Sequence, residues 1–188
     1  MRMDPSEQLT AATLVNEWEE QDLARIFRDL GEERRARAVA RAIVRRRADK
    51  PFADTLDLAD CVAGVVGHSG RIHPATRVFQ ALRMTVNREL EALEAALEAA
   101  PALLKPGGRI AVITFHSLED RIVKRFFKAR SAKEIDRPEW PEPRPNPVCT
   151  LRVLTRRPVS AAETEVRNNP RARSAKLRVA ERLDDNEA

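Results

Sequence analysis

The sequence predicts an α/β fold that is preceded by a small all-helical module. Apolar residues recur at helical spacing from about residue 10 to residue 74, and a nearly uninterrupted apolar run covers residues 109–115. Helical patterns lie on both sides of that run. The order helix, strand, helix is typical of a parallel sheet whose two faces are covered by helices.

Four helices are expected in the first part of the chain. Gly31 is expected to end the second helix, and Asp54 or Thr55 to cap the fourth. Apolar residues three or four positions apart mark the buried side of each helix. Helix by helix, they are Leu14, Val15 and Trp18; Leu23, Ile26, Phe27 and Leu30; Ala36, Val39, Ala40 and Ile43; and Leu58, Cys61, Val62 and Val65.

The third of these helices, expected over residues 33–48, carries a basic ridge on one side. A row of cations fits the phosphate groups of nucleic acid. Charges on an amphipathic helix usually serve solubility instead, and Glu32 and Glu33 are close in the sequence. We predict phosphate contact, with a solvated helix face as the alternative. The ridge consists of Arg34, Arg37, Arg41 and Arg45.

A long helix of about 25 residues is expected to begin at Pro74, because proline fits a first helical turn, where its missing N–H costs nothing. Pro101 and the turn at residues 105–108 are expected to end this helix. Arg77 and Arg83 lie on it and are further candidates for phosphate contacts.

A candidate site follows the apolar run at residues 109–115, which is expected to form a buried strand. Ligands enter open α/β sheets at the carboxyl ends of strands, so His116, Ser117 and Asp120 are candidates for a pocket wall. Ser117 and Asp120 have the spacing of a capping box, which is the preferred interpretation of both. His116 remains open between a catalytic or pocket residue and a structural histidine. His73 is interpreted as a helix cap rather than a catalytic group.

The sequence pattern of the last part of the chain predicts a loop followed by a pair of strands. Five prolines fall within residues 138–147, which argues against a regular element there. Two short β-like runs follow at residues 150–155 and 176–180. We expect them to pair as an antiparallel hairpin.

Composition limits the kind of protein. The formal net charge of +5 and the sequence pI of about 9.7 favour an acidic partner such as nucleic acid. Cys61 and Cys149 lack the spacing of a zinc site, and two cysteines in 188 residues are no disulfide framework. No metal is therefore expected. No run approaches the roughly 20 apolar residues of a membrane span, so a cytoplasmic protein is expected.

Five motifs along the chain resemble one family. They are residues 1–4 (MRMD), 31–34 (GEER), 73–83 (HPATRVFQALR), 115–126 (FHSLEDRIVKRF) and 169–174 (NPRARS). Together and in this order they are similar to the RsmH (MraW) family of ribosomal RNA methyltransferases. The family methylates N4 of a cytidine in the decoding region of small-subunit (16S) ribosomal RNA, with S-adenosylmethionine as methyl donor.

The resemblance implies a class I, Rossmann-like methyltransferase sheet of seven strands with an inserted helical domain for RNA recognition. Residues 1–8 would end a loop of the catalytic domain, residues 9–72 would be the insert, and residues 73–188 the C-terminal part of the methyltransferase domain. Residues 109–115 would be the fifth strand, and the last two β-like runs the sixth and seventh. Strands one to four and the donor-binding loop precede the MRMD motif in the family. No cofactor-binding residue is therefore expected in this chain.

The run at residues 64–70 contains the Gly-His-Ser letters of the family's donor-binding loop. A loop that cradles a nucleotide must follow a strand and open a helix. Here a helix is expected before the run. We therefore interpret it as the end of that helix and a connecting loop.

Three hypotheses follow for function. The first is a partial N4-cytosine methyltransferase that is inactive alone and binds 16S ribosomal RNA or the small ribosomal subunit. The second is an RNA-binding module without catalysis, and the third is a truncated chain without function. The unpaired edge of the expected sheet also predicts self-association.

Overall fold

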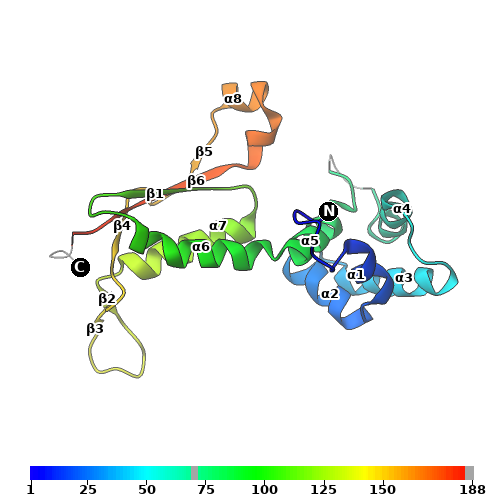
Figure 1. Cartoon of the computed structure of the whole chain (residues 1–188), viewed down its shortest axis with the longest axis horizontal. Helices are drawn as coiled ribbons and strands as arrows, with labels where there is room; N and C mark the ends of the chain where they lie inside the picture. Colours follow the sequence, from blue (N-terminus) through cyan, green and yellow to red (C-terminus); the bar gives the residue numbers. More distant parts are fainter. Residues whose placement is uncertain (69–71, 185–188) are drawn as a thin grey trace. The chain divides into compact units, whose positions relative to one another are not determined.

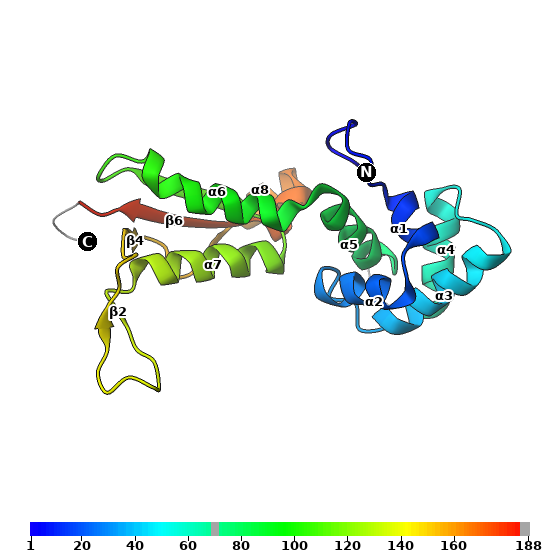
Figure 2. The same cartoon turned by 60° about the horizontal axis from the view of Figure 1, so that its bottom comes forward.

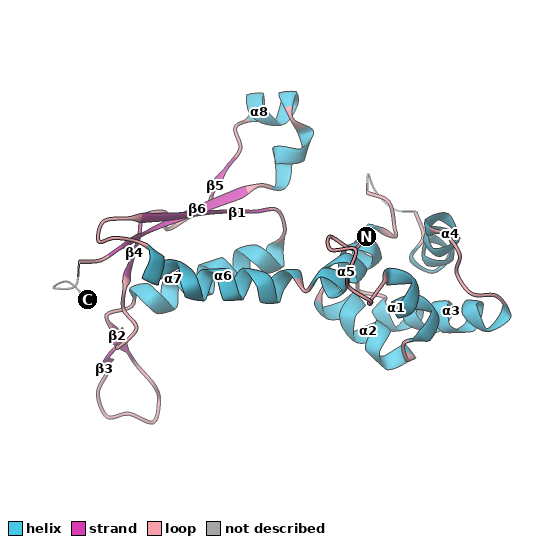
Figure 3. Cartoon of the chain, viewed as in Figure 1, coloured by secondary structure: helices cyan, strands magenta, loops and turns pink. Residues whose placement is uncertain are grey.

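The computed structural model describes residues 1–68 and 72–184, and the chain divides into two compact units, Met1–Glu89 and Leu90–Ala188. The described part of the first unit contains only helices, whereas the second combines helices with strands (Figures 1 and 3). The boundary at residues 72–73 that the resemblance implies remains a prediction. No helix among the described residues is both long and apolar enough to span a membrane.

The helical unit confirms the four helices expected before residue 74. Thr10 caps the first, and Asp54 caps the fourth by accepting a hydrogen bond from the N–H of Asp57. One apolar core joins the helices, with Leu14, Leu23 and Phe27 fully buried. The helices of this unit are α1 (Ala11–Glu17), α2 (Glu20–Asp29), α3 (Ala36–Asp49), α4 (Thr55–Val66) and α5 (Thr76–Asn87).

Gly31 follows the end of α2, as expected, and has a packing reason to be glycine. A Cβ atom at this position would lie 2.7 Å from the carbonyl oxygens of both Phe27 and Arg77. Both atoms belong to backbone, so neither can move aside cheaply. Glycine therefore permits close contact between the end of α2 and the start of α5.

The expectation of one long helix from Pro74 is wrong. The segment is divided into α5 and α6 (Glu89–Leu103), because Arg88 adopts a left-handed conformation with φ of 49°. The Arg88 N–H bonds the carbonyls of the last turn of α5. Arginine rarely adopts this conformation, so the sequence carries no signal for the break. Pro101 lies inside α6 and does not end it.

The second unit contains a sheet in which β1 (Arg109–Thr114) and β4 (Leu151–Val153) lie on either side of β6 (Lys176–Arg182). Both pair with β6 in antiparallel orientation. The expected parallel pairing of neighbours is therefore wrong, although β1 and β4 do run in the same direction. The helix α7 (Ser117–Ser131) connects them. The expected antiparallel pairing of the last two β-like runs is confirmed by β4 and β6.

Helices cover one face of this sheet. Leu97 of α6 packs with Val123 and Phe127 of α7 against Leu151 and Ala180. Both helices run alongside β6 (Figures 1 and 2), and in Figure 1 they lie on the same side of it. Residues alternate along a strand between its two faces, and on the opposite face Ile113 is 60% exposed. Among the described residues the second face is uncovered, so the expectation of helices on both faces is wrong.

The proline-rich stretch is more ordered than expected. Short strands β2 (Glu134–Ile135) and β3 (Arg144–Pro145) form an antiparallel pair that projects from the sheet unit (Figure 1). At its tip the guanidinium carbons of Arg137 and Arg144 lie 4.9 and 4.6 Å from the centre of the Trp140 ring. The remaining elements are β5 (Val159–Ser160), α8 (Glu163–Asn168) and the 3-10 helix η1 (Pro170–Ser174).

Candidate functional site

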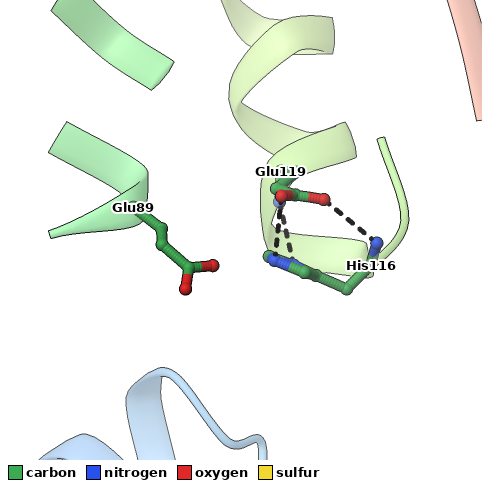
Figure 4. Close-up of side chains that lie close together, drawn as sticks. All are labelled: Glu89, His116 and Glu119. Carbon is green, nitrogen blue, oxygen red and sulfur yellow. Dashed lines mark hydrogen bonds and ion pairs between the residues drawn. The ribbon is translucent and has the colours of Figure 1, made fainter. Parts of the chain in front are cut away.

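His116 caps α7 at the carboxyl end of β1. Its Nδ1 accepts a hydrogen bond from the backbone N–H of Glu119 at 3.3 Å. The Glu119 carboxylate in turn accepts from the N–H of Phe115 at 2.8 Å. It also accepts from the N–H of His116 at 3.2 Å, and Figure 4 shows these two residues facing each other. This is a capping box one residue earlier than expected. The predicted box of Ser117 and Asp120 is wrong, because Ser117 already belongs to the helix.

The acceptor role of His116 Nδ1 determines where its proton lies. A neutral imidazole with Nδ1 as acceptor carries its hydrogen on Nε2. Nε2 is buried and lies 3.2 Å from Glu119 Oε1. Burial alone would raise the pKa of Glu119, but hydrogen bonds from His116 and Phe115 outweigh it and hold this pKa below its ordinary value.

Asp120 joins α7 to β6. Its carboxylate oxygens lie 2.7 and 3.1 Å from the guanidinium nitrogens of Arg178, and Lys176 approaches at 3.7 Å. The side chains of Asp120 and Arg178 are only 13% and 7% exposed. The hydrogen bond from Arg178 lowers the pKa of Asp120. Asp120 is therefore an ion-pair partner rather than the cap that the sequence suggested, and this pair positions the start of α7 on the sheet.

The expectation that His73 caps the helix is wrong, because the N-cap of α5 is Ala75 and no side chain caps it. The Nδ1 atom of His73 accepts a hydrogen bond from the N–H of Ala75 at 3.2 Å, in the turn that leads into α5. The run at residues 64–70 begins inside α4, which ends at Val66, and Gly67 follows with a positive φ of 77°. It therefore follows a helix, not a strand, although residues 69–71 lie outside the described part of the chain.

The basic ridge on α3 is exposed along its whole length. The helix begins at Ala36, later than expected, so Arg34 lies in the turn before it while Arg37, Arg41 and Arg45 lie on it; all four are at the surface. The ridge is partly compensated, because Arg41 lies 3.5 Å from Glu20 of α2. A shallow depression of about 440 Å³ lies at its N-terminal end. That depression is lined by Arg28, Glu33, Arg34, Arg35, Ala36, Arg37 and Ala38.

The other two predicted phosphate contacts are not equivalent to the ridge. Arg83 is already engaged by Glu89, through two hydrogen bonds of 2.8 and 2.9 Å. Arg77 is exposed on α5. Arg77 and Arg83 are six residues apart, which corresponds to a rotation of about 240° around a helix. Their side chains therefore lie on different sides of α5. The structure therefore supports Arg77 better than Arg83 as a site for phosphate.

Comparison with known proteins gives one consistent family. Residues 1–183 match the model of the MraW methylase family. The chain is 52% identical over 186 residues to the ribosomal RNA small subunit methyltransferase H of Synechococcus elongatus, covering 97% of this chain and 56% of that protein. The protein of the same name from Geobacter sulfurreducens is 54% identical over 190 residues, with 97% and 60% covered. The chain thus spans somewhat more than half the length of these relatives.

Proposed function

Because this chain belongs to the MraW methylase family, we propose that it is part of an enzyme that methylates N4 of a cytidine in the decoding region of 16S ribosomal RNA. The observation that carries the proposal is the match along 97% of the chain to relatives named as ribosomal RNA small subunit methyltransferases. The chain alone would be inactive, and the 16S RNA or the small subunit in the cytoplasm would be its partner. An RNA-binding module without catalysis is the alternative.

The proposal assigns β1, β4 and β6 to the fifth, sixth and seventh strands of the family's sheet. Their order along the chain and the crossover through α7 support it. Among the described strands, β1 pairs only with β6, so its other edge is available. We propose that strands one to four continue from this edge and come from residues outside the sequence given. Without strands one to four, the unpaired edge of β1 beside the exposed Ile113 favours self-association of the chain.

The same assignment places the donor site outside these 188 residues. S-adenosylmethionine would be held by a Gly-rich loop after the first strand, and the only run with similar letters follows α4. We therefore expect isothermal titration of S-adenosylmethionine into this chain to give no saturable heat. The ligand should bind to a full-length relative measured in parallel. Micromolar, saturable binding to this chain would contradict the assignment.

The proposed reaction needs a group that orients the amine and a group that accepts its proton, because the N4 lone pair is delocalised into the ring. His116 is a candidate for contact with the substrate. Its Nε2 carries a hydrogen while Nδ1 accepts from Glu119, so it is suited to donate a hydrogen bond and not to accept the proton. We propose that the proton acceptor lies outside this chain.

We propose that the α3 ridge contacts RNA phosphates. Replacing Arg37 and Arg41 with alanine should reduce the slope of log affinity against log salt by about one per lost phosphate contact, or somewhat less. The measurement is a fluorescence titration of a decoding-region RNA fragment at several salt concentrations, after circular dichroism shows that both proteins fold alike. Lys105→Ala plus Lys133→Ala is the matched control. Equal slopes in all three proteins would assign the ridge to solvation.

A further inference from the structure

The outward side of α7 carries a second row of cations, here called the α7 basic face. All four of its members are exposed. At 100° per residue they fall within an arc of about 100° and within roughly 10 Å along the helix. The sequence motif that contains most of them served only to identify the family. The members are Arg121, Lys124, Arg125 and Lys128.

Arg121 has an interaction of its own, whereas the other three members of this face lack local acidic compensation among the residues that the structure describes. The two carboxylates of α7 are used elsewhere, since Glu119 belongs to the capping box and Asp120 pairs with Arg178. Glu98 of α6 pairs with Arg130, which points to the opposite side of α7 from Arg121. Within the part of the chain that the structure describes, Lys124, Arg125 and Lys128 form no ion pair with a carboxylate. Their charge therefore faces solvent undiminished, unlike that of Arg41 in the ridge, near Glu20.

The helix that presents this face is anchored. Val123 and Phe127 on its other side are buried in the core of the sheet unit. The ion pair between Asp120 and Arg178 fixes its first turn to β6. A partner would have to order only the side chains of the face and not the backbone, which lowers the entropy cost of binding.

The charge balance of the two units favours the same surface. Residues 90–188 hold 19 Lys and Arg against 15 Asp and Glu, whereas residues 1–89 hold 15 against 14. Most of the net positive charge thus belongs to the sheet unit. Phosphates follow one another at about 3.4 Å per strand along a double-helical axis. Three cations, Lys124, Arg125 and Lys128, over roughly 6 Å of helix match that density of charge.

We propose that the α7 basic face binds the phosphate backbone of the RNA substrate, as a contact surface separate from the α3 ridge. This inference rests on the proposed function, because it takes RNA as the partner. The contacts would position the RNA without reading its sequence, since phosphates carry no base identity. Lys124, Arg125 and Lys128 would make them.

The test compares three variants with the parent chain, using a fluorescein-labelled decoding-region RNA fragment over a series of KCl concentrations. Lys124→Gln plus Lys128→Gln removes two charges from the face. Lys105→Gln plus Lys133→Gln removes two exposed charges elsewhere in the same unit. Lys124→Arg plus Lys128→Arg keeps the charge. Circular dichroism establishes that all four proteins have the same fold.

We expect the face variant to bind roughly tenfold more weakly at low salt, with a log–log slope reduced by one to two. The control variant should change little, and the arginine variant should bind like the parent. If the face variant and the control variant lost RNA affinity equally, the effect would come from net charge alone. That result would overturn the inference. Unchanged binding of the face variant would overturn it while leaving the proposed function intact. A parent chain that binds no RNA would overturn both.

Discussion

Replacing Asp120 with alanine is expected to lower the free energy of unfolding by about 3–5 kcal/mol, the usual cost of removing one partner of a buried ion pair. Arg178 would be left with its charge, because its guanidinium cannot be deprotonated. It is 7% exposed, so water cannot replace the carboxylate. The measurement is urea denaturation at pH 7, followed by circular dichroism.

The same pair predicts a pH dependence. The pKa of Asp120 is lowered in the folded protein by the hydrogen bond from Arg178. A carboxyl group with a lowered pKa stabilises the fold above its unfolded value of about 3.9, and this contribution is lost as the pH falls through the folded pKa. The difference between parent and Asp120→Ala should therefore shrink below about pH 4.

A double variant provides the control for this prediction. Asp120→Leu plus Arg178→Met removes both charges and should recover much of the lost stability, because apolar replacements of a buried pair are often neutral or better. If Asp120→Ala unfolds at the same urea concentration as the parent, the pair does not hold α7 on the sheet.

Replacing Phe27 with alanine is expected to lower the stability of the helical unit by about 3–5 kcal/mol, because it removes a large ring from a close-packed core. Phe27 is fully buried among α-helical residues of the first unit. Trp18 packs against the same core and reports its unfolding by fluorescence. The second tryptophan, Trp140, would be replaced with phenylalanine in all samples, so that only Trp18 is observed.

The matched control for Phe27 is Leu56→Ala. Leu56 is 73% exposed on α4, so its truncation should change stability by no more than about 0.5 kcal/mol. A Phe27→Ala protein that unfolds like the Leu56→Ala protein would show that the helices do not share the core described here.

The helices and strands that sequence predicted well are those with a local cause. The periodic apolar residues of α1 to α4 and the apolar run of β1 depend only on neighbours in the chain. The break at Arg88 had no local signal, because arginine is not a residue that marks a left-handed turn. The pairing of β1 with β6 joins segments far apart in the sequence and had no local signal either. Apolar residues on both faces of β1 suggested that helices cover both faces of the sheet, whereas the described residues cover one.

The features of the candidate site also separate into those with a local signal in the sequence and those that depend on distant residues. The exposure of Arg37, Arg41 and Arg45 follows from helical spacing and was predictable. The partner of Asp120 was not, because Arg178 lies 58 positions away and only the fold brings them together. The engagement of Arg83 by Glu89 depends on the turn at Arg88 and was missed for that reason. The α7 basic face did have a signal, in cations at positions 121, 124, 125 and 128.

The central claim is that this chain supplies a working part of a 16S ribosomal RNA methyltransferase. It is tested most directly by a hybrid in which this chain replaces the matching portion of the Synechococcus elongatus enzyme, to which it is 52% identical. The measurement is mass spectrometry of nucleosides from small-subunit RNA that was incubated with the hybrid and S-adenosylmethionine. The account predicts N4-methylcytidine in the decoding region. A hybrid that folds, binds the donor and binds the RNA, but forms no N4-methylcytidine there, would contradict it.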